Sequence, residues 1–182
     1  NLFFEASTRT RMSFHTALAR LGGAVVDTTG FTFSSLSKGE SLEDTARVIA
    51  GYADIIAMRH PEEGSVAQFA APINVPVINA GDGAGEHPSQ ALLDYYSISK
   101  EFERLDKSID GMSIAMVGDL KHGRTIHSLC KLLSLFNNIK FRFIAPDNLR
   151  APASLIALLK TRGHEVSECD SLAAGLPHSD VI

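Results

Sequence analysis

Cysteine is scarce and tryptophan is absent from this 182-residue sequence. The two cysteines, Cys130 and Cys169, supply neither a disulfide framework nor a cysteine-rich metal site, and Cys130 lies in a helical apolar pattern typical of a buried free thiol. Free thiols fit a reducing, cytoplasmic setting. No apolar run approaches the roughly 20 residues of a membrane-spanning helix. The net charge of −4 favours neither nucleic acid nor an acidic membrane as a partner.

Two common cofactor signatures are also missing. The turn at residues 118–124, Gly-Asp-Leu-Lys-His-Gly-Arg, is short and glycine-containing, but it matches neither Gly-x-Gly-x-x-Gly nor Gly-Lys-Ser/Thr. His122 and His127 are not spaced as metal ligands, and no carboxylate cluster accompanies them. We therefore expect no metal and no cofactor. A nucleotide-binding oxidoreductase domain is kept as an alternative that would use this turn.

Apolar runs that predict strands alternate along the chain with amphipathic patterns that predict helices. This order is typical of parallel sheets flanked by helices, so we expect an α/β protein. The expected strands are at residues 1–4, 24–26, 55–58, 75–78, 112–117 and 141–145, from 166, and at 180–182. The expected helices are at residues 14–21, 42–53, 65–71, 88–100, 126–136, 153–162 and 172–176.

The charged segment at residues 101–111, which ends in glycine, marks the expected domain boundary. We expect one domain over residues 1–103, including a connecting helix, and a second domain over residues 104–182. The chain starts inside a predicted strand without a methionine, and a parallel sheet ending at residue 182 would expose an edge. The N-terminal part of the first domain and the C-terminal part of the second are therefore expected to be missing.

A hydroxyl-rich, cationic turn at residues 7–11 joins a predicted strand to a predicted helix. Its sequence is Ser-Thr-Arg-Thr-Arg, and the apolar helical pattern begins directly after it at Phe14. Backbone N–H groups lack partners at such a helix start, and the helix dipole is positive there. Because Arg9 and Arg11 add forked cationic donors, the turn predicts a phosphate or carboxylate site. The alternative is an ordinary helix cap followed by two surface arginines.

Three further unusual stretches follow predicted strands, at residues 59–61, 81–90 and 118–124. Ligands of open parallel sheets bind outside the carboxyl ends of the strands, so these stretches and residues 7–11 are expected at ligand-binding edges. Arg59 can point a donor at such a ligand, and His87 and Gln90 can face one ligand from the start of a helix. A solvated charge at a strand end and a capping histidine are the ordinary alternatives. The glycines around Asp82 would let the backbone pass close to a ligand.

The motifs, taken together, resemble those of the aspartate/ornithine carbamoyltransferase family. They are Phe-Phe-Glu-Ala-Ser-Thr-Arg-Thr-Arg at 3–11, Met-Arg-His-Pro at 58–61, Asn-Ala-Gly-Asp-Gly at 79–83, His-Pro-Ser-Gln-Ala-Leu-Leu-Asp at 87–94 and Met-Val-Gly-Asp-Leu-Lys-His-Gly-Arg-Thr at 116–125. They occur in the family's order and cover most of the chain. The Gly-Asp-Leu-Lys-x-Gly-Arg-Thr element resembles the branch that acts on aspartate, because the ornithine branch usually has an asparagine-rich turn there.

The resemblance implies a role for individual residues. The phosphate of carbamoyl phosphate would be held by Ser7, Thr8, Arg9 and Thr10. The carbamoyl carbonyl oxygen would be held by Thr10, Arg59 and His87, and the carbamoyl amide by Gln90. The catalytic residues would be Arg9 and the three donors to the carbonyl oxygen, Thr10, Arg59 and His87.

Other implied roles concern aspartate and the assembly. Arg124 and Lys38 would bind aspartate, and Glu5 would brace the interface between the domains. Ser35 and Lys38 would reach into the active site of a neighbouring subunit. The sequence alone would favour a flexible surface lysine at Lys38. The resemblance therefore implies a homotrimer with shared active sites, and it allows a zinc-containing regulatory chain as a further partner.

The implied reaction transfers a carbamoyl group from carbamoyl phosphate to the amine of L-aspartate, the committed step of de novo pyrimidine biosynthesis. Negative charge would grow on the carbonyl oxygen and then on the departing phosphate, which explains the concentration of cationic and hydroxyl donors. No residue is an obvious base for the amine proton, and the phosphate itself is our hypothesis. An ornithine carbamoyltransferase and a non-catalytic phosphate-binding assembly module remain the alternatives.

Overall fold

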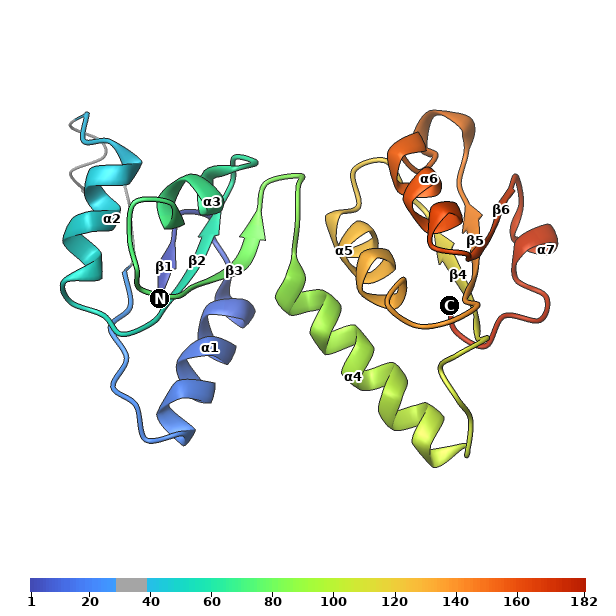
Figure 1. Cartoon of the computed structure of the whole chain (residues 1–182), viewed down its shortest axis with the longest axis horizontal. Helices are drawn as coiled ribbons and strands as arrows, with labels where there is room; N and C mark the ends of the chain where they lie inside the picture. Colours follow the sequence, from blue (N-terminus) through green and yellow to red (C-terminus); the bar gives the residue numbers. More distant parts are fainter. Residues whose placement is uncertain (29–38) are drawn as a thin grey trace. The chain divides into compact units, whose positions relative to one another are not determined.

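The computed structural model describes residues 1–28 and 39–182, and the chain divides into two compact units (Figure 1). The first unit is Asn1–Ser89 and the second is Gln90–Ile182. Each unit contains a three-stranded sheet whose strands are all parallel. The expected fold class, two parallel-sheet domains flanked by helices, is confirmed.

The first unit is built on strands β1 (Leu2–Phe3), β2 (Ile56–His60) and β3 (Val77–Asp82), in that order across the sheet. Helices α1 (Thr8–Arg20), α2 (Leu42–Ala50) and α3 (Ser65–Ala70) connect them. The core packs apolar strand residues against the inner faces of α2 and α3, and its buried members are Leu2, Ala46, Ile56, Met58, Val66 and Phe69. Because all three strands run in parallel, their carboxyl ends lie at the same edge of the sheet.

Helix α1 differs from the other helices of the first unit because none of its residues is buried. The apolar stripe expected from Phe14 to Leu21 exists in the sequence, yet Leu21 is 84% exposed. Helix α2 follows the sequence more closely, since the hydroxyl of Ser41 accepts a hydrogen bond from the Asp44 backbone N–H at 3.1 Å. This is an N-cap interaction, of the kind that favours serine directly before a helix.

The second unit contains α4 (Pro88–Arg104), whose first residues still belong to the first unit. It continues with β4 (Ser113–Val117), α5 (Arg124–Leu133), β5 (Lys140–Ile144), the 3₁₀ turn η3 (Asp147–Leu149), α6 (Ala153–Thr161), β6 (Glu165–Cys169) and α7 (Leu172–Gly175). The sheet order is β4-β5-β6. Val181 forms a parallel bridge to Ile114, so the strand expected at residues 180–182 is present as a single pairing beside β4.

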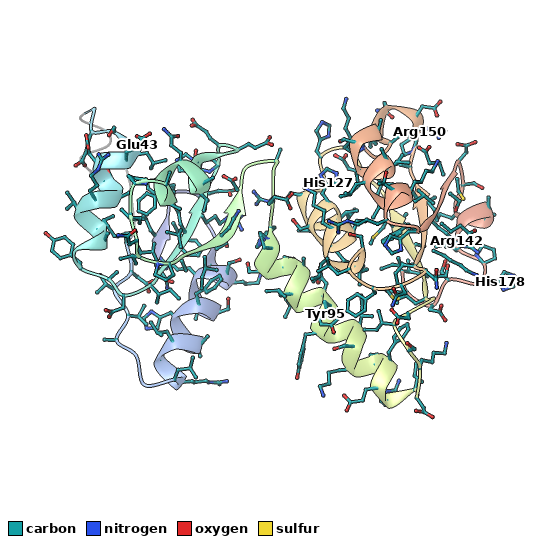
Figure 2. The ribbon with its side chains drawn as sticks, viewed as in Figure 1. Glu43, Tyr95, His127, Arg142, Arg150 and His178 are labelled. Atoms are coloured by element: carbon teal, nitrogen blue, oxygen red, sulfur yellow. The ribbon has the colours of Figure 1, made fainter. Side chains whose placement is uncertain are left out.

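Helix α4 packs on the second unit through a face that the sequence pattern did not reveal. Leu92, Tyr95, Tyr96 and Ser99 recur in the sequence at helical spacing, but Leu92 and Tyr96 are exposed. The buried residues are Ala91, Ile98 and Phe102, and the Tyr95 ring stacks on Phe136 with centroids 5.4 Å apart (Figure 2). The buried side of the helix is thus marked by three widely spaced residues of different sizes.

Two other expectations fare differently. The strand expected at residues 24–26 is wrong, because these residues form neither a strand nor a bridge and Val26 is exposed; the bridge from Leu2 is to Thr28, two residues later. The domain boundary after residue 103 stays a prediction. Contacts group α4 with the second unit, although α4 directly follows the last strand of the first.

Candidate functional site

The N-terminus of α1 is a candidate anion site at the carboxyl edge of the first sheet. Ser7 is its N-cap residue, with extended backbone angles of φ −156° and ψ 92°, and its side chain makes no capping hydrogen bond. The first turn contains no acidic residue. The N–H groups of Thr8, Arg9 and Thr10 therefore carry the positive end of the helix dipole without an intrahelical acceptor. An anion placed there would receive backbone hydrogen bonds and charge stabilisation.

The cationic side chains of this turn are available to such an anion. Arg9 is exposed and Arg11 is half-buried. Within the described part of the chain, neither arginine forms an ion pair with a carboxylate. Arg59, by contrast, is held in place by its neighbours.

Arg59 lies in the neighbouring strand and is oriented by Glu5. Its backbone carbonyl accepts a hydrogen bond from the Phe4 N–H at 2.8 Å, which joins β2 to the turn before α1. The Arg59 Nε–H donates to a Glu5 carboxylate oxygen at 2.9 Å, and the Arg59 side chain is only 12% exposed. Nε–H is one of five guanidinium N–H donors, so this bond orients the group while using a small part of its capacity.

His87 closes the loop after β3, directly before α4. It is buried, and its Nδ1 lies 3.3 Å from the Ser89 hydroxyl. The loop is closed by a backbone bond in which the Asp82 N–H donates to the Glu86 carbonyl at 3.1 Å. The third strand end of the sheet thus contributes a fixed imidazole to the edge that also carries Arg59.

Asp82 connects the segment that follows β2, the strand of Arg59, with the loop that carries His87, and sequence reasoning missed this role. Its carboxylate accepts hydrogen bonds from the Gly64 N–H at 3.1 Å and the Val66 N–H at 3.4 Å, at the start of α3. The carboxylate therefore lies against the positive end of that helix. An aspartate between two glycines, shortly after a predicted strand, was the signal available in the sequence.

Gly83 makes the same connection through the backbone. Its N–H donates to the His60 carbonyl at 2.9 Å, and its φ is +54°. A Cβ added there would lie 2.7 Å from the Pro61 carbonyl oxygen and 2.6 Å from the Glu63 backbone nitrogen. The close approach expected at this glycine is therefore to the neighbouring loop of the protein itself.

Two expected residues belong to the second unit. Gln90 lies in the first turn of α4, where its side-chain Nε2 donates to the Asp94 carboxylate at 2.8 Å. Arg124 is the first residue of α5 and follows the turn after β4. The strand-end position that the sequence predicts for Arg124 is confirmed.

The turn before Arg124 is held by a carboxylate and an imidazole. Asp119 accepts from the backbone N–H groups of Lys121 at 3.1 Å and His122 at 3.0 Å. The bond from His122 is the main cause that lowers the pKa of Asp119 below its ordinary value. His127 of α5, which is labelled in Figure 2, bonds through Nε2 to the Leu120 carbonyl at 2.7 Å.

The remaining expectations and features lie away from this edge. Ser35 and Lys38 are outside the described residues. An open depression of about 690 Å³ lies where β2 and β3 begin, lined in part by Arg47, Asp54 and Asn74. It is at the amino ends of the strands and so belongs to a different face. In residues 1–28 and 39–182, no cluster of three metal-ligating side chains and no helix able to cross a membrane is present.

The chain is similar to carbamoyltransferases in sequence and in structure. Residues 1–100 match the family model for "Aspartate/ornithine carbamoyltransferase, carbamoyl-P binding domain". The chain is 79% identical over 182 residues to the aspartate carbamoyltransferase catalytic subunit of Dichelobacter nodosus, covering all of this chain and 52% of that protein. The chain thus spans about half the length of the curated relatives it matches.

Two solved structures give the same result. The catalytic subunit of Methanocaldococcus jannaschii aspartate transcarbamoylase superposes with a TM-score of 0.86 at 49% identity, covering 99% of this chain and 58% of that chain. The Trypanosoma cruzi enzyme in complex with carbamoyl aspartate and phosphate superposes with a TM-score of 0.89 at 42% identity, covering 99% of this chain and 59% of that chain.

Proposed function

The chain belongs to the aspartate/ornithine carbamoyltransferase family, and from this premise we propose that the protein transfers the carbamoyl group of carbamoyl phosphate to L-aspartate. The products are N-carbamoyl-L-aspartate and phosphate, which is the committed step of de novo pyrimidine biosynthesis. The observation that carries the proposal is the carboxyl edge of the first sheet. There the uncapped, cationic start of α1 lies beside the strand end that carries Arg59.

The phosphate of carbamoyl phosphate is assigned to the start of α1. Its oxygens accept hydrogen bonds from the backbone and the hydroxyl groups of this turn, and Arg9 neutralises their charge. These contacts strengthen as the phosphate departs, because its charge increases when the bond to the carbamoyl carbon breaks. The residues assigned to the phosphate are Ser7, Thr8, Arg9 and Thr10.

The carbonyl oxygen of the carbamoyl group is assigned to Arg59, His87 and Thr10. The aspartate amine attacks the carbamoyl carbon, and negative charge develops on this oxygen. Donors that are already oriented stabilise that charge without reorganisation, and losing one typically lowers kcat about 10²–10³-fold. The Glu5 bond and the burial of His87 supply this orientation in the structure.

The proton and the second substrate complete the proposed reaction. The departing phosphate accepts the proton that the attacking amine loses, so the products balance without a protein base. Gln90 contacts the carbamoyl amide, and Arg124 and Lys38 bind the carboxylates of aspartate. Holding both substrates in line supplies a further part of the rate through proximity.

The assembly and its setting are part of the proposal. Ser35 and Lys38 enter the active site of a neighbouring subunit, which makes the protein a homotrimer with shared sites, and Glu5 braces the interface between the domains. A regulatory chain that contains zinc is a possible further partner. Free cysteines, one of them buried, are consistent with the cytoplasm.

The test compares carbamoyl transfer to aspartate and to ornithine by the full-length protein and two variants. Arg59→Ala removes a proposed donor to the carbonyl oxygen. Arg47→Ala is the control, because Arg47 lies on α2 and pairs with Asp44 at 2.6 Å, away from the candidate edge. We expect carbamoyl-aspartate from the parent, a kcat about 10²-fold lower or more in Arg59→Ala, and near-parental activity in Arg47→Ala.

Each contrary outcome selects another function. Turnover with ornithine alone would identify an ornithine carbamoyltransferase. Tight carbamoyl-phosphate binding without turnover of either amine would identify a phosphate-binding assembly module. Equal activity of Arg59→Ala and its parent would refute the assigned role of Arg59.

A further inference from the structure

Gln90 is hydrogen-bonded within its own helix to a residue that has no assigned role. The Gln90 Nε2 donates to Asp94 Oδ1 at 2.8 Å. The two residues are one helical turn apart on α4, so their side chains lie on the same face of the helix. Both residues are partly buried, which limits the freedom of the pair to swing into solvent.

The chemistry of the two groups determines which end of the Gln90 amide the partner takes. A glutamine amide has a donating NH₂ end and an accepting oxygen end, whereas a carboxylate only accepts hydrogen bonds. The bond to Asp94 therefore engages the NH₂ end of Gln90. The Oε1 atom, an acceptor, is the end left for a ligand.

We propose that Asp94 is a specificity-determining positioning residue, which fixes the Gln90 amide so that the site accepts a hydrogen bond from the NH₂ group of carbamoyl phosphate. This inference rests on the proposed function, in which Gln90 contacts the carbamoyl amide. An acyl phosphate with a methyl group in place of NH₂ offers no donor to Oε1. The pair thus selects the carbamoyl group against acyl groups of similar size.

A purely structural role of the pair makes a different prediction. Glutamine–aspartate pairs one turn apart are ordinary, weak contributors to helix stability. If Asp94 acted only in this way, its replacement would change the binding of carbamoyl phosphate and of the methyl analogue by the same factor. If Asp94 orients the amide, its replacement weakens the use of carbamoyl phosphate as a substrate. It leaves the binding of the methyl analogue unchanged, since the analogue has no donor for the Gln90 oxygen.

The variants separate these possibilities on the full-length protein. Asp94→Asn keeps the size of the side chain, but it can present its own NH₂ group to Gln90. The Gln90 amide can then rotate by half a turn, so that its NH₂ end faces the ligand. Asp94→Ala removes the partner, and Asp94→Glu keeps an acceptor-only group. Glu101→Gln is the matched control. Glu101 lies on the same helix, about three turns after Gln90, and its carboxylate accepts a hydrogen bond from the Arg104 Nε–H at 2.8 Å.

The measurements are kcat and KM for carbamoyl phosphate with aspartate, and the inhibition constant of acetyl phosphate as a competing ligand. In Asp94→Asn and Asp94→Ala we expect kcat/KM for carbamoyl phosphate to fall about tenfold or more, as for a site that loses one substrate hydrogen bond. The acetyl phosphate constant stays within about twofold, so selectivity falls by the same factor of about ten. Asp94→Glu and Glu101→Gln retain the parental selectivity.

A double variant tests the route through Gln90. In a Gln90→Ala background, Asp94→Asn should have no further effect on selectivity, because the amide that it orients is gone. An additional loss there would overturn the inference, as would an unchanged ratio in the folded Asp94→Asn and Asp94→Ala single variants. If the parent protein made no carbamoyl-aspartate at all, the proposed function itself would fail, which is a distinct result.

Discussion

Replacement of Asp82 by alanine tests whether one carboxylate holds together the loop after β2, the strand of Arg59, and the loop that carries His87. Asp82 is 7% exposed, and its carboxylate accepts hydrogen bonds from the Gly64 and Val66 N–H groups at 3.1 and 3.4 Å. Alanine removes this acceptor at a place where water has little access. The start of α3 then loses both a cap and a charge that complements its dipole.

The expected loss follows from these two bonds. A hydrogen bond to a charged group contributes about 1.5–3 kcal/mol, and truncating a helix cap costs about 1 kcal/mol. The bond to Val66 is long, so we count the Gly64 bond fully and the Val66 bond in small part. The local free energy of opening at α3 should fall by about 2 kcal/mol, which is roughly a 30-fold increase in the open population.

Amide hydrogen exchange measures this opening locally, without assuming that the two units unfold together. Peptides covering residues 64–70 should exchange roughly 30-fold faster in Asp82→Ala, while peptides from α2 serve as the internal reference. Asp82→Asn keeps an oxygen acceptor and should show a smaller change. Exchange at α3 that matches the parent in Asp82→Ala would refute the role assigned to this carboxylate.

A matched aspartate in the second unit controls for the loss of any carboxylate between loops. The Asp110 carboxylate accepts from the Asn137 backbone N–H at 2.7 Å, and these residues precede β4 and β5. Asp110→Ala should therefore leave exchange at α3 unchanged. It should also leave KM for carbamoyl phosphate unchanged, whereas Asp82→Ala should raise that KM because both loops lose their common support.

Three shorter predictions follow from other contacts. Burial raises the pKa of Cys130 to about 12, so mass spectrometry should find this thiol unlabelled by iodoacetamide at pH 8 in the native protein and labelled in urea. Gly83→Ala should lower the unfolding midpoint, since its φ is +54° and the new Cβ would meet the Glu63 backbone nitrogen; an unchanged midpoint would contradict the close approach. The backbone bond from His122 lowers the pKa of Asp119 in the folded state. The ionised carboxylate therefore stabilises the folded protein above the unfolded-state pKa of about 4, and this stabilisation is lost as pH falls through the lower folded-state pKa. Asp119→Asn should remove this part of the acid dependence in urea titrations, and an unaltered dependence would argue against it.

The arrangement of strands, and therefore the edge where the site lies, could be predicted from sequence. Apolar runs alternate with amphipathic helices, and parallel strands require their carboxyl ends to share an edge. The positions of Arg59, His87 and Arg124 follow from that rule together with the strand ends. The strand expected at residues 24–26 was wrong, because three apolar residues do not specify a pairing partner, and the chain bridges to Leu2 only at Thr28.

Sequence patterns could not identify the buried face of α4 or the carboxylate that supports each donor. Both depend on contacts between residues that are distant in the sequence or on neighbouring elements. On α4 the large residues Leu92, Leu93 and Tyr96 are exposed while Ala91 is buried, so apolar size alone does not identify the buried side. Asp82 contacts residues 16 and 18 positions earlier, and that pairing exists only because β2 and β3 are neighbours. Asp94 was within reach of sequence reasoning, since its spacing of four residues from Gln90 places both on one helical face.

The proposed substrate is an anion, yet Glu5 and Asp94 stand directly behind groups assigned to it. Each carboxylate opposes binding of an anion by charge repulsion. The Glu5 bond offsets part of this cost because it fixes the Arg59 side chain before the substrate arrives, and fixing a free arginine costs about 2 kcal/mol of rotamer entropy. Orientation therefore matters most in the transition state, where charge develops on the carbonyl oxygen and donors already in place stabilise it without moving. A carboxylate behind each donor is thus consistent with a site organised for the reaction more than for tight binding of the ground state.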